Sequence, residues 1–514
     1  MLVGLFVFYY GFLSEENWLF YSHFFVRIVG QKKGNKGAVF MGRTPIYTRV
    51  YNQLRYQILS GELPIGSHLP PERKLAARLG ASRNTVVRAY AELEVEGFIA
   101  GKMGSGRYVE ALPPAPALSR IHWSSQHNYT HLHAAPPHMA ELLAITDTYP
   151  DTINFAHGDG GKHTLVTSGF PAYVKSAADQ INSYFFTSVQ GFPLLREQLV
   201  RWMGFEQVSS PEQVCVTSGS QEGLYLITSM LARPGDCIVT EMPTYFGSLQ
   251  LFQSLGIQVI PVPLDQEGMK TDILEGILGR YRPRFIYTVP TFHNPTGYTL
   301  SLARRKHLLS LSEHYGIPVV EDDAYRHLHL DTPPPPALKA LDQAGHVIYL
   351  NTLSKLLFPG LRIGWIAANQ HFIQLVSRLK ELSISTNTLG QIALANYLKA
   401  DALTPHLARS RNLYRQQAEV MEAHLQPLTA LGLQYEKAAG GFYFWVSLPE
   451  GVEARKLMQT CRQKGVSFTC GDMFLLRHAE QPYIRLCFTH EPPSQIERGM
   501  SIISEILTRQ KEEA

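Results

Sequence analysis

The sequence has little cysteine and no long uninterrupted hydrophobic run. Its five cysteines in 514 residues are too few and too irregularly spaced for a disulfide framework or a Cys-x-x-Cys metal site, which favours a reducing, cytoplasmic setting. Charged residues make up 18% of the chain and hydrophobic residues 45%, so the composition excludes a disordered, collagen-like or coiled-coil protein. At roughly 100–200 residues per domain, the length predicts two to four domains.

The apolar N-terminus falls short of a membrane span. Residues 1–13 and 18–25 are apolar, but Glu15 and Glu16 separate them. A spanning helix needs about 20 consecutive apolar residues, and each carboxylate at mid-membrane would cost roughly 2.5–3.5 kcal/mol. We therefore interpret residues 1–42 as a leader: either it is disordered, or Met41 is the true start and residues 1–40 precede it. A membrane anchor is the alternative, and we expect no membrane partner.

Positive charge is concentrated between residues 43 and 108. This stretch holds ten lysines and arginines against five glutamates, whereas the chain that follows it is mildly acidic. A short basic segment joined to a larger acidic body is the expected footprint of a small module that binds a polyanion.

Local signals predict three helices and a hairpin within residues 43–110. Apolar residues recur at helical spacing, and proline, glycine and serine mark the helix ends. Gly80 ends the second helix where a left-handed residue is favoured, and Ser82 caps the third. The predicted helices are 46–60, 72–79 and 83–96, and the predicted strands are 98–99 and 108–109.

A helix, a short turn and a second helix form the arrangement that lays a recognition helix in the major groove of DNA. The first turn of the third helix offers guanidinium, amide and hydroxyl groups suited to base edges and phosphates. The glycine-rich turn between the strands adds basic groups for a flanking groove or phosphate. The alternative is a helical hairpin whose charges are only solvated. The candidate DNA-binding residues are Arg73, Ser82, Arg83, Asn84, Thr85, Arg88, Lys102, Ser105 and Arg107.

Residues 111–150 contain several prolines and histidines and are interpreted as a linker. Beyond them, buried strands alternate with helical segments. This alternation predicts an α/β domain with a mainly parallel sheet over 151–514, in which a ligand binds beyond the carboxyl ends of the strands. The predicted strands are 214–217, 237–241, 258–262, 285–289, 319–321, 347–350 and 364–367.

Polar clusters that follow these strands together fit one ligand. Each cluster alone also has an ordinary structural interpretation, such as a turn or a core aromatic. The segment 218–223 is rich in glycine and serine and opens a helix, so it offers a phosphate cradle. Lys355 offers an amine that forms a Schiff base with an aldehyde, and Asp322 offers a carboxylate that keeps a pyridine nitrogen protonated. Arg485 suits bidentate capture of a carboxylate.

Both parts of the chain resemble known families. Residues 61–109 closely resemble the GntR-type winged helix. Residues 152–510 resemble the fold-type-I aminotransferases of class I/II, on the Asn-Pro-Thr-Gly motif, the Ser-Lys motif and a downstream arginine. The second resemblance implies pyridoxal 5′-phosphate (PLP) as cofactor.

The same resemblance implies a set of site residues. Lys355 would carry the Schiff base, with Asp322 and Tyr325 as its catalytic partners, and Arg485 would bind the carboxylate of a substrate or effector. The implied cofactor-binding residues are Gly219, Ser220, Gln221, Tyr245, Asn294, Asp322, Tyr325, Thr352, Ser354, Lys355 and Arg362.

The chain departs from this family at two places. Phe186 stands where the family usually has a tyrosine that reaches the partner subunit's phosphate. The loop 157–162 also strays from the usual Gly-x-Pro-Asp form, so substrate contacts near Gly158 are left open.

The two modules in one chain resemble the MocR-like branch of GntR regulators. This resemblance implies a homodimer that binds double-stranded operator DNA through the winged helix. The large domain is then expected to sense PLP, an amino compound or both. The alternatives are a catalytically active PLP-dependent aminotransferase with an appended helix-turn-helix, and a cofactor-binding scaffold with neither activity.

Overall fold

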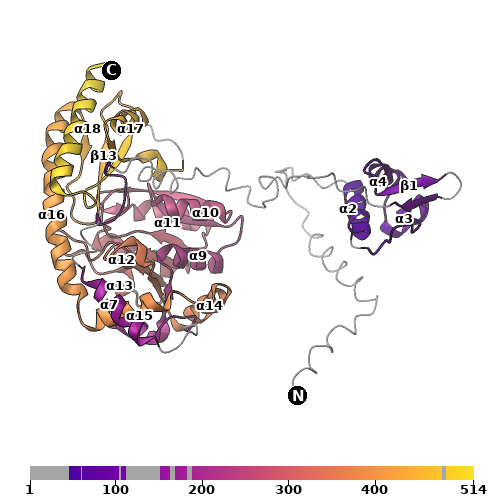
Figure 1. The fold of residues 1–514 in the computed structure, drawn as a ribbon, viewed down its shortest axis with the longest axis horizontal. Helices are drawn as coiled ribbons and strands as arrows, with labels where there is room; N and C mark the ends of the chain where they lie inside the picture. Colours follow the sequence, from indigo (N-terminus) through magenta and orange to yellow (C-terminus); the bar gives the residue numbers. More distant parts are fainter. Residues whose placement is uncertain are drawn as a thin grey trace. The chain divides into compact units, whose positions relative to one another are not determined.

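The computed structural model describes most of two compact units, and the chain divides between them at Gln126 and His127 (Figure 1). The interpretations of residues 1–42 and 111–150, and that of Phe186, lie outside the described residues. Among the described residues, no helix is long and apolar enough to cross a membrane. The described residues are 46–59, 61–102, 106–110, 151–161, 168–181, 188–476 and 482–513.

The small unit contains the three predicted helices and the hairpin. Ser82 caps the third helix by accepting a hydrogen bond from the Thr85 N–H at 3.2 Å, and Gly80 follows the second helix with a φ of 59°. The strands are longer than predicted because their antiparallel pairing extends to Lys102 and Gly106 at the turn. The elements are α2 (Ile46–Leu59), α3 (Glu72–Leu79), α4 (Arg83–Val95), β1 (Ile99–Lys102) and β2 (Gly106–Val109).

One face of α4 forms the centre of the small core. Val86, Ala89, Tyr90 and Leu93 recur at helical spacing, and all are fully buried. They pack in one cluster with apolar side chains of α2, α3 and both strands. The Tyr90 hydroxyl donates to the carbonyl oxygen of Pro70 at 2.8 Å, so this aromatic is satisfied at both its apolar and polar ends.

The large unit is built around an eight-stranded sheet, ordered β4-β11-β10-β9-β8-β5-β6-β7. Six strands are parallel, and only β11 and β7 run against their neighbours. This confirms the predicted α/β domain with a mainly parallel sheet. The strands are β4 (Val214–Thr217), β5 (Cys237–Met242), β6 (Gln258–Asp265), β7 (Gly268–Met269), β8 (Ile286–Thr288), β9 (Val319–Asp322), β10 (Val347–Thr352) and β11 (Gly364–Ala367).

Both faces of this sheet are buried, which explains why its strands read as continuous apolar runs. Val214 and Val216 contribute to one hydrophobic cluster, whereas the intervening Cys215 contributes to another. The covering helices include α8 (Pro193–Met203), α9 (Ser220–Leu231), α10 (Phe246–Ser254), α11 (Thr271–Tyr281), α12 (Leu302–Tyr315), α13 (Leu338–Leu341) and α14 (Gln370–Lys380), and α7 (Phe170–Gln180) packs on α15 (Thr388–Lys399).

A second, four-stranded antiparallel sheet lies near the C-terminus, where the sequence analysis predicted no strands. Its strands pair in the order β12-β13-β16-β15. The long helices α16 and α18 lie side by side along the unit (Figure 1). The bounds are β3 (Ile153–Asn154), β12 (Gln434–Tyr435), β13 (Tyr443–Ser447), β14 (Val466–Ser467), β15 (Thr469–Cys470), β16 (Tyr483–Cys487), α16 (Leu403–Leu428), α17 (Ala454–Gln463) and α18 (Pro493–Glu513).

Candidate functional site

The candidate site residues gather at one edge of the large sheet. The parallel strands β4, β5, β8, β9 and β10 all end at this edge, and the antiparallel strand β11 begins there. The carboxyl ends of these strands therefore carry the polar segments that the sequence singled out. Lys355 follows β10, and Asp322 is the last residue of β9.

Lys355 lies at the centre of this edge. Its Nζ donates a hydrogen bond to the carbonyl oxygen of Gly158 at 2.7 Å. Burial lowers the pKa of Lys355, and the nearby carboxylate of Asp159 partly offsets that shift. A lowered pKa increases the fraction of neutral amine, which is the form that attacks an aldehyde.

Asp322 is a buried residue, and only one of its two carboxyl oxygens has a hydrogen-bond partner among the described residues. Its Oδ2 accepts a hydrogen bond from the Tyr287 hydroxyl at 3.0 Å, while Oδ1 has no hydrogen-bond partner among the described residues. Burial raises the pKa of Asp322 to about 7. An orphaned carboxylate oxygen in the interior is costly unless a donor meets it, and a protonated pyridine nitrogen is such a donor. The site therefore fits the cofactor at this position.

The residues predicted to hold the phosphate also come together. Gly219 has a φ of 86°, and a Cβ built there would lie 2.7 Å from an Nη atom of Arg362. That guanidinium donates to the Ser218 carbonyl oxygen at 2.7 Å, from an exposed position. Thr352 and Ser354 hydrogen-bond to each other through their hydroxyls at 3.0 Å. Only glycine leaves room for arginine and backbone to approach this closely.

Helix α9 adds its N-terminus to this cradle. Ser220 is the first residue of α9. The backbone N–H groups at the start of a helix lack intrahelical partners and are suited to binding an anion. Gln221 donates through Nε2 to the Gly247 carbonyl oxygen at 2.9 Å, which ties the start of α9 to the first turn of α10. Tyr245 occupies the N-cap position of α10 without a side-chain capping bond, and burial raises the pKa of its hydroxyl to about 12.

A buried network of hydrogen bonds joins Arg485, in β16 of the four-stranded sheet, to Asn294 and Tyr325, which follow strands of the large sheet. Arg485 donates through Nη1 to Asn294 Oδ1 at 3.0 Å and through Nη2 to the Ala156 carbonyl oxygen at 2.6 Å. Asn294 Nδ2 donates to the Tyr325 hydroxyl at 3.4 Å, and Tyr325 lies 3.3 Å from the hydroxyl of Tyr443. Arg485 is only 2% exposed, and its Nε has no hydrogen-bond partner among the described residues.

Sequence reasoning missed three contributors to this site. Tyr287 lies in a strand that was predicted only as apolar, and its alternating position could have placed it on the site face. Tyr443 lies beneath the Arg485 guanidinium, with 4.2 Å between that group's carbon and the ring centroid. Asp159 sits in a loop that was noted only as a departure. Tyr443 belongs to a strand that the sequence did not predict, so no local signal marked it.

The candidate DNA-binding side chains lie mostly on the surface of the small unit. Arg73, Arg83 and Asn84 are exposed. Arg88 pairs with Glu92 at 3.4 Å and stacks on the ring of Tyr47 at 3.7 Å.

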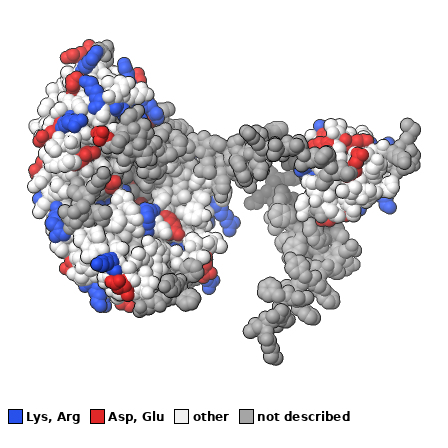
Figure 2. Space-filling view, in the orientation of Figure 1, with Lys and Arg blue, Asp and Glu red and all other residues white. Residues whose placement is uncertain are grey.

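Several of these candidates also have partners within the unit. Arg107 pairs with Glu72 at 2.5 Å and with Glu94 at 3.3 Å, and the hydroxyls of Ser82 and Thr85 lie 2.8 Å apart. The face of the small unit in Figure 2 accordingly shows acidic as well as basic groups. The side chain of Lys102, and all of Ser105, lie outside the described residues.

Comparison with known proteins identifies both units. Residues 151–503 match the model for aminotransferase class I and II, and residues 46–109 match that for bacterial regulatory proteins of the gntR family. The chain belongs to the class I and II aminotransferase family and carries a GntR-type DNA-binding domain at its N-terminal side. The large unit has the fold-type-I aminotransferase architecture, and the small unit is the winged helix.

Named relatives fall into two groups. The chain is 30% identical to the probable rhizopine catabolism regulatory protein MocR of Rhizobium meliloti, over 88% of this chain and 89% of that one. It is 34% identical to aromatic-amino-acid aminotransferase 1 of Thermococcus litoralis, over 71% of this chain and 90% of the relative. The match to the regulatory protein therefore spans both units, whereas the match to the aminotransferase covers mainly the large one.

A solved structure supports the fold of the large unit. The α-aminoadipate aminotransferase of Thermus thermophilus, complexed with N-(5′-phosphopyridoxyl)-L-leucine, aligns with a TM-score of 0.69 at 29% identity. The alignment covers 74% of this chain and 96% of that enzyme.

Proposed function

We propose that this protein is a PLP-dependent transcriptional regulator of the MocR-like type, which binds DNA through its winged helix and senses PLP, an amino compound or both in its large unit. The observation that carries the proposal is the orphaned buried oxygen of Asp322 at the sheet edge that also holds Lys355, in a chain that also has a GntR-type domain. A buried carboxylate oxygen without a donor is costly, and at this position the donor would be a ligand that also reaches Lys355.

The cofactor, when bound, supplies an aldehyde for a lysine amine and a protonated ring that stabilises negative charge at the Cα of an amino compound. The chain's own residues supply the rest. Lys355 would provide the amine, and Asp322 would hold a proton at the pyridine nitrogen. Asn294 and Tyr325 would bind the ring oxygen, and Tyr245 would contact the ring.

The remaining residues fix the two charged ends of the ligand. Arg485 is held in place by Asn294 and by the Ala156 carbonyl oxygen, and it presents a desolvated guanidinium to a carboxylate. The phosphate end would be held by Gly219, Ser220, Gln221, Thr352, Ser354 and Arg362.

On the DNA side, the exposed first turn of α4 enters the major groove, with Arg83 and Asn84 as the principal base and phosphate contacts. We propose a homodimer as the binding form, with two winged helices reading two half-sites. An effector shifts DNA affinity only if it binds the two conformational states of the protein with different affinities.

Gel shifts with the upstream intergenic DNA test this proposal. The expected result is a specific shift that changes when PLP or an amino compound is added. Lys355→Ala should abolish this response while leaving part of the basal DNA binding. An effector response that is unchanged in Lys355→Ala would refute the sensing role.

An active aminotransferase is the second candidate, favoured by the completeness of the residue set around Lys355. Half-transamination rates with a panel of amino acids discriminate between the two. Rapid conversion of one amino acid, with DNA binding unaffected by it, would favour the enzyme.

A further inference from the structure

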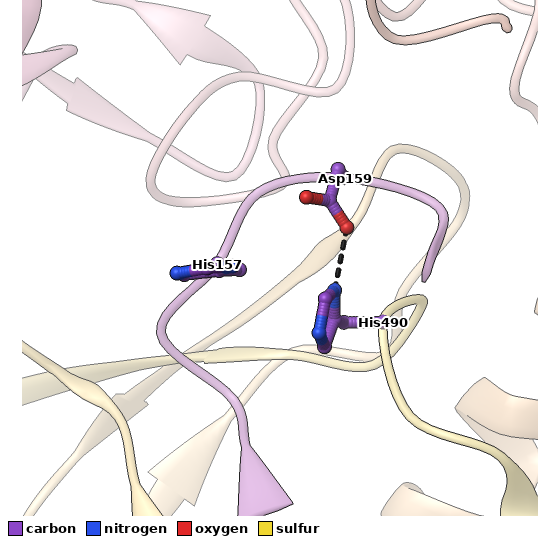
Figure 3. Close-up of side chains that lie close together, drawn as sticks. All are labelled: His157, Asp159 and His490. Atoms are coloured by element: carbon purple, nitrogen blue, oxygen red, sulfur yellow. Dashed lines mark hydrogen bonds and ion pairs between the residues drawn. The ribbon is translucent and has the colours of Figure 1, made fainter. Parts of the chain in front are cut away.

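Two side chains near Lys355, those of Asp159 and His490, have no part in the proposed function. Asp159 lies in the loop after β3, and His490 follows β16, more than 300 residues later in the chain. Figure 3 shows the two side chains facing each other, joined by a hydrogen bond, with His157 beside them. The His157 and His490 ring centroids are 5.2 Å apart.

The segment around His490 holds Asp159 at two points. His490 Nδ1 and Asp159 Oδ1 are 2.5 Å apart, which fits a ring nitrogen that donates to the carboxylate. The Thr489 hydroxyl donates to the backbone carbonyl oxygen of Asp159 at 2.7 Å. The Gly161 N–H donates to the same carboxylate oxygen at 3.0 Å. These contacts fix both the side chain and the backbone of one residue.

Asp159 directly follows Gly158, the residue that contacts Lys355. Gly158 accepts the hydrogen bond from Lys355 Nζ at 2.7 Å, and a Cβ at Gly158 would collide with the Tyr443 hydroxyl. The loop is therefore pressed between Tyr443 on one side and the Thr489–His490 segment on the other. A shift of Asp159 would move the Gly158 carbonyl away from Lys355.

The carboxylate also acts on the lysine through its charge. The ionisable groups that face Lys355 are Asp159, Arg485, Cys487 and Asp322, and Asp159 has the largest effect among them. Burial alone would raise the pKa of Asp159, but the hydrogen bond and charge of His490 lower it to about 2. Asp159 is therefore ionised at neutral pH.

We propose that Asp159 and His490 form a positioning pair that holds the Gly158 carbonyl against Lys355 and keeps one negative charge beside the lysine amine. The pair would set both the orientation and the proton affinity of the amine before it meets an aldehyde. This inference rests on the proposed function, because it assigns a role toward the same cofactor.

The rate at which the apo-protein captures PLP, measured by absorbance across a pH range, tests this pair. Capture condenses the neutral amine with the aldehyde and releases one water, so the pH midpoint of the rate reports the proton affinity of Lys355. Asp159→Asn removes the negative charge and should move that midpoint down by about one pH unit. His490→Ala should lower the limiting rate at high pH roughly tenfold or more, because the carbonyl contact is lost.

Two further variants control for misfolding and for a different use of the cluster. His490→Gln retains an N–H donor and should recover most of the limiting rate, which a general loss of folding would not permit. His157→Ala should leave the limiting rate unchanged and move the midpoint much less than Asp159→Asn does, because the charge of His157 is the smallest of the effects on Asp159. A midpoint that stays in place in Asp159→Asn would overturn the proposal.

The nearest donor atoms of His157, Asp159 and His490 lie within 4.8 Å of one another, so metal binding is the competing outcome. A zinc-dependent change in capture that His157→Ala removes would overturn the positioning role in favour of a metal site. Wild-type protein that captures no PLP would instead refute the proposed function. Normal wild-type capture with unaltered variants would refute this inference alone.

Discussion

The two units differ in how their polar side-chain atoms are paired. In the winged helix, charged groups pair with one another near the surface, as Arg107 does with Glu72 and Glu94. In the aminotransferase-like unit, polar atoms at the sheet edge are buried without partners, including Asp322 Oδ1 and Arg485 Nε. Among the described residues, the small unit leaves only Ser67 Oγ in that state. We propose that a ligand donor meets the orphaned oxygen of Asp322 in the large unit, whereas the small unit binds through its exposed side chains.

The largest loss of stability in the small unit is therefore expected from substitution of a buried core side chain. Leu93 is fully buried in α4, so Leu93→Ala should cost about 2–5 kcal/mol of unfolding free energy and remove specific DNA binding. In calorimetry of the full chain, only the unfolding transition of the small unit should move to a lower temperature. Val95 is 88% exposed, and Val95→Ala is the matched control, expected to change stability by less than about 0.5 kcal/mol. Equal effects of the two variants would contradict the placement of α4.

In the large unit, the largest effect on cofactor binding is expected at Asp322, whose Oδ1 has no hydrogen-bond partner among the described residues. Asp322→Asn removes the charge that would meet the pyridine nitrogen, so PLP affinity should fall by about 1.5–3 kcal/mol, or roughly 10- to 150-fold. Equilibrium titration of the cofactor absorbance measures this change. Unchanged affinity would mean that the orphaned oxygen does not face the cofactor.

The surface of α4 should carry the DNA affinity. Arg83→Ala should weaken operator binding by about 1–3 kcal/mol and reduce its dependence on salt. Fluorescence anisotropy at several salt concentrations separates the two effects. Arg280, exposed on α11 in the large unit, gives a control variant, Arg280→Ala, which should bind DNA normally. Normal binding by Arg83→Ala would exclude this turn as the reading element.

Loss of the α4 cap should have a smaller effect. Ser82 Oγ accepts from the Thr85 N–H, so Ser82→Ala should destabilise the small unit by about 1 kcal/mol. Ser82→Asp retains an acceptor and should restore most of that stability. Chemical denaturation of the full chain, followed in the small unit, gives the measurement.

The stability of the apo-protein should also depend on pH through Asp322. Its pKa rises from 3.8 to about 7 on folding, so its contribution is fully present below pH 4 and is lost as the pH rises through 7. Wild type should thus lose more stability over this window than Asp322→Asn. Glu241 and Glu321 are also buried with pKa values raised to about 7, so only the difference between the two proteins is diagnostic. Parallel pH profiles would contradict the assigned burial.

The winged helix could be predicted almost completely from the sequence, because its signals are local. The cap at Ser82, the stop at Gly80 and the apolar spacing in α4 each act within a few residues. The central sheet was also predictable, since buried parallel strands read as short apolar runs. The C-terminal sheet was not predicted, because β12 and β15 have only two residues each and the charged Arg485 interrupts the apolar residues of β16.

The same distinction applies to the candidate site. Lys355, Asp322 and Asn294 each follow a strand of the predicted sheet, so their convergence follows from the parallel topology. Tyr443 and His490 come from the C-terminal sheet and its flanking loop, and only the fold brings them to the lysine. The assigned roles of the site residues stay predictions until ligand binding is measured.

The most direct test of the account is reduction of the PLP-treated protein with borohydride, followed by peptide mass analysis. We predict one phosphopyridoxyl group, attached to Lys355 and absent from Lys355→Ala. A wild-type protein that remains unlabelled, or that carries the label on surface lysines only, would contradict the central claim.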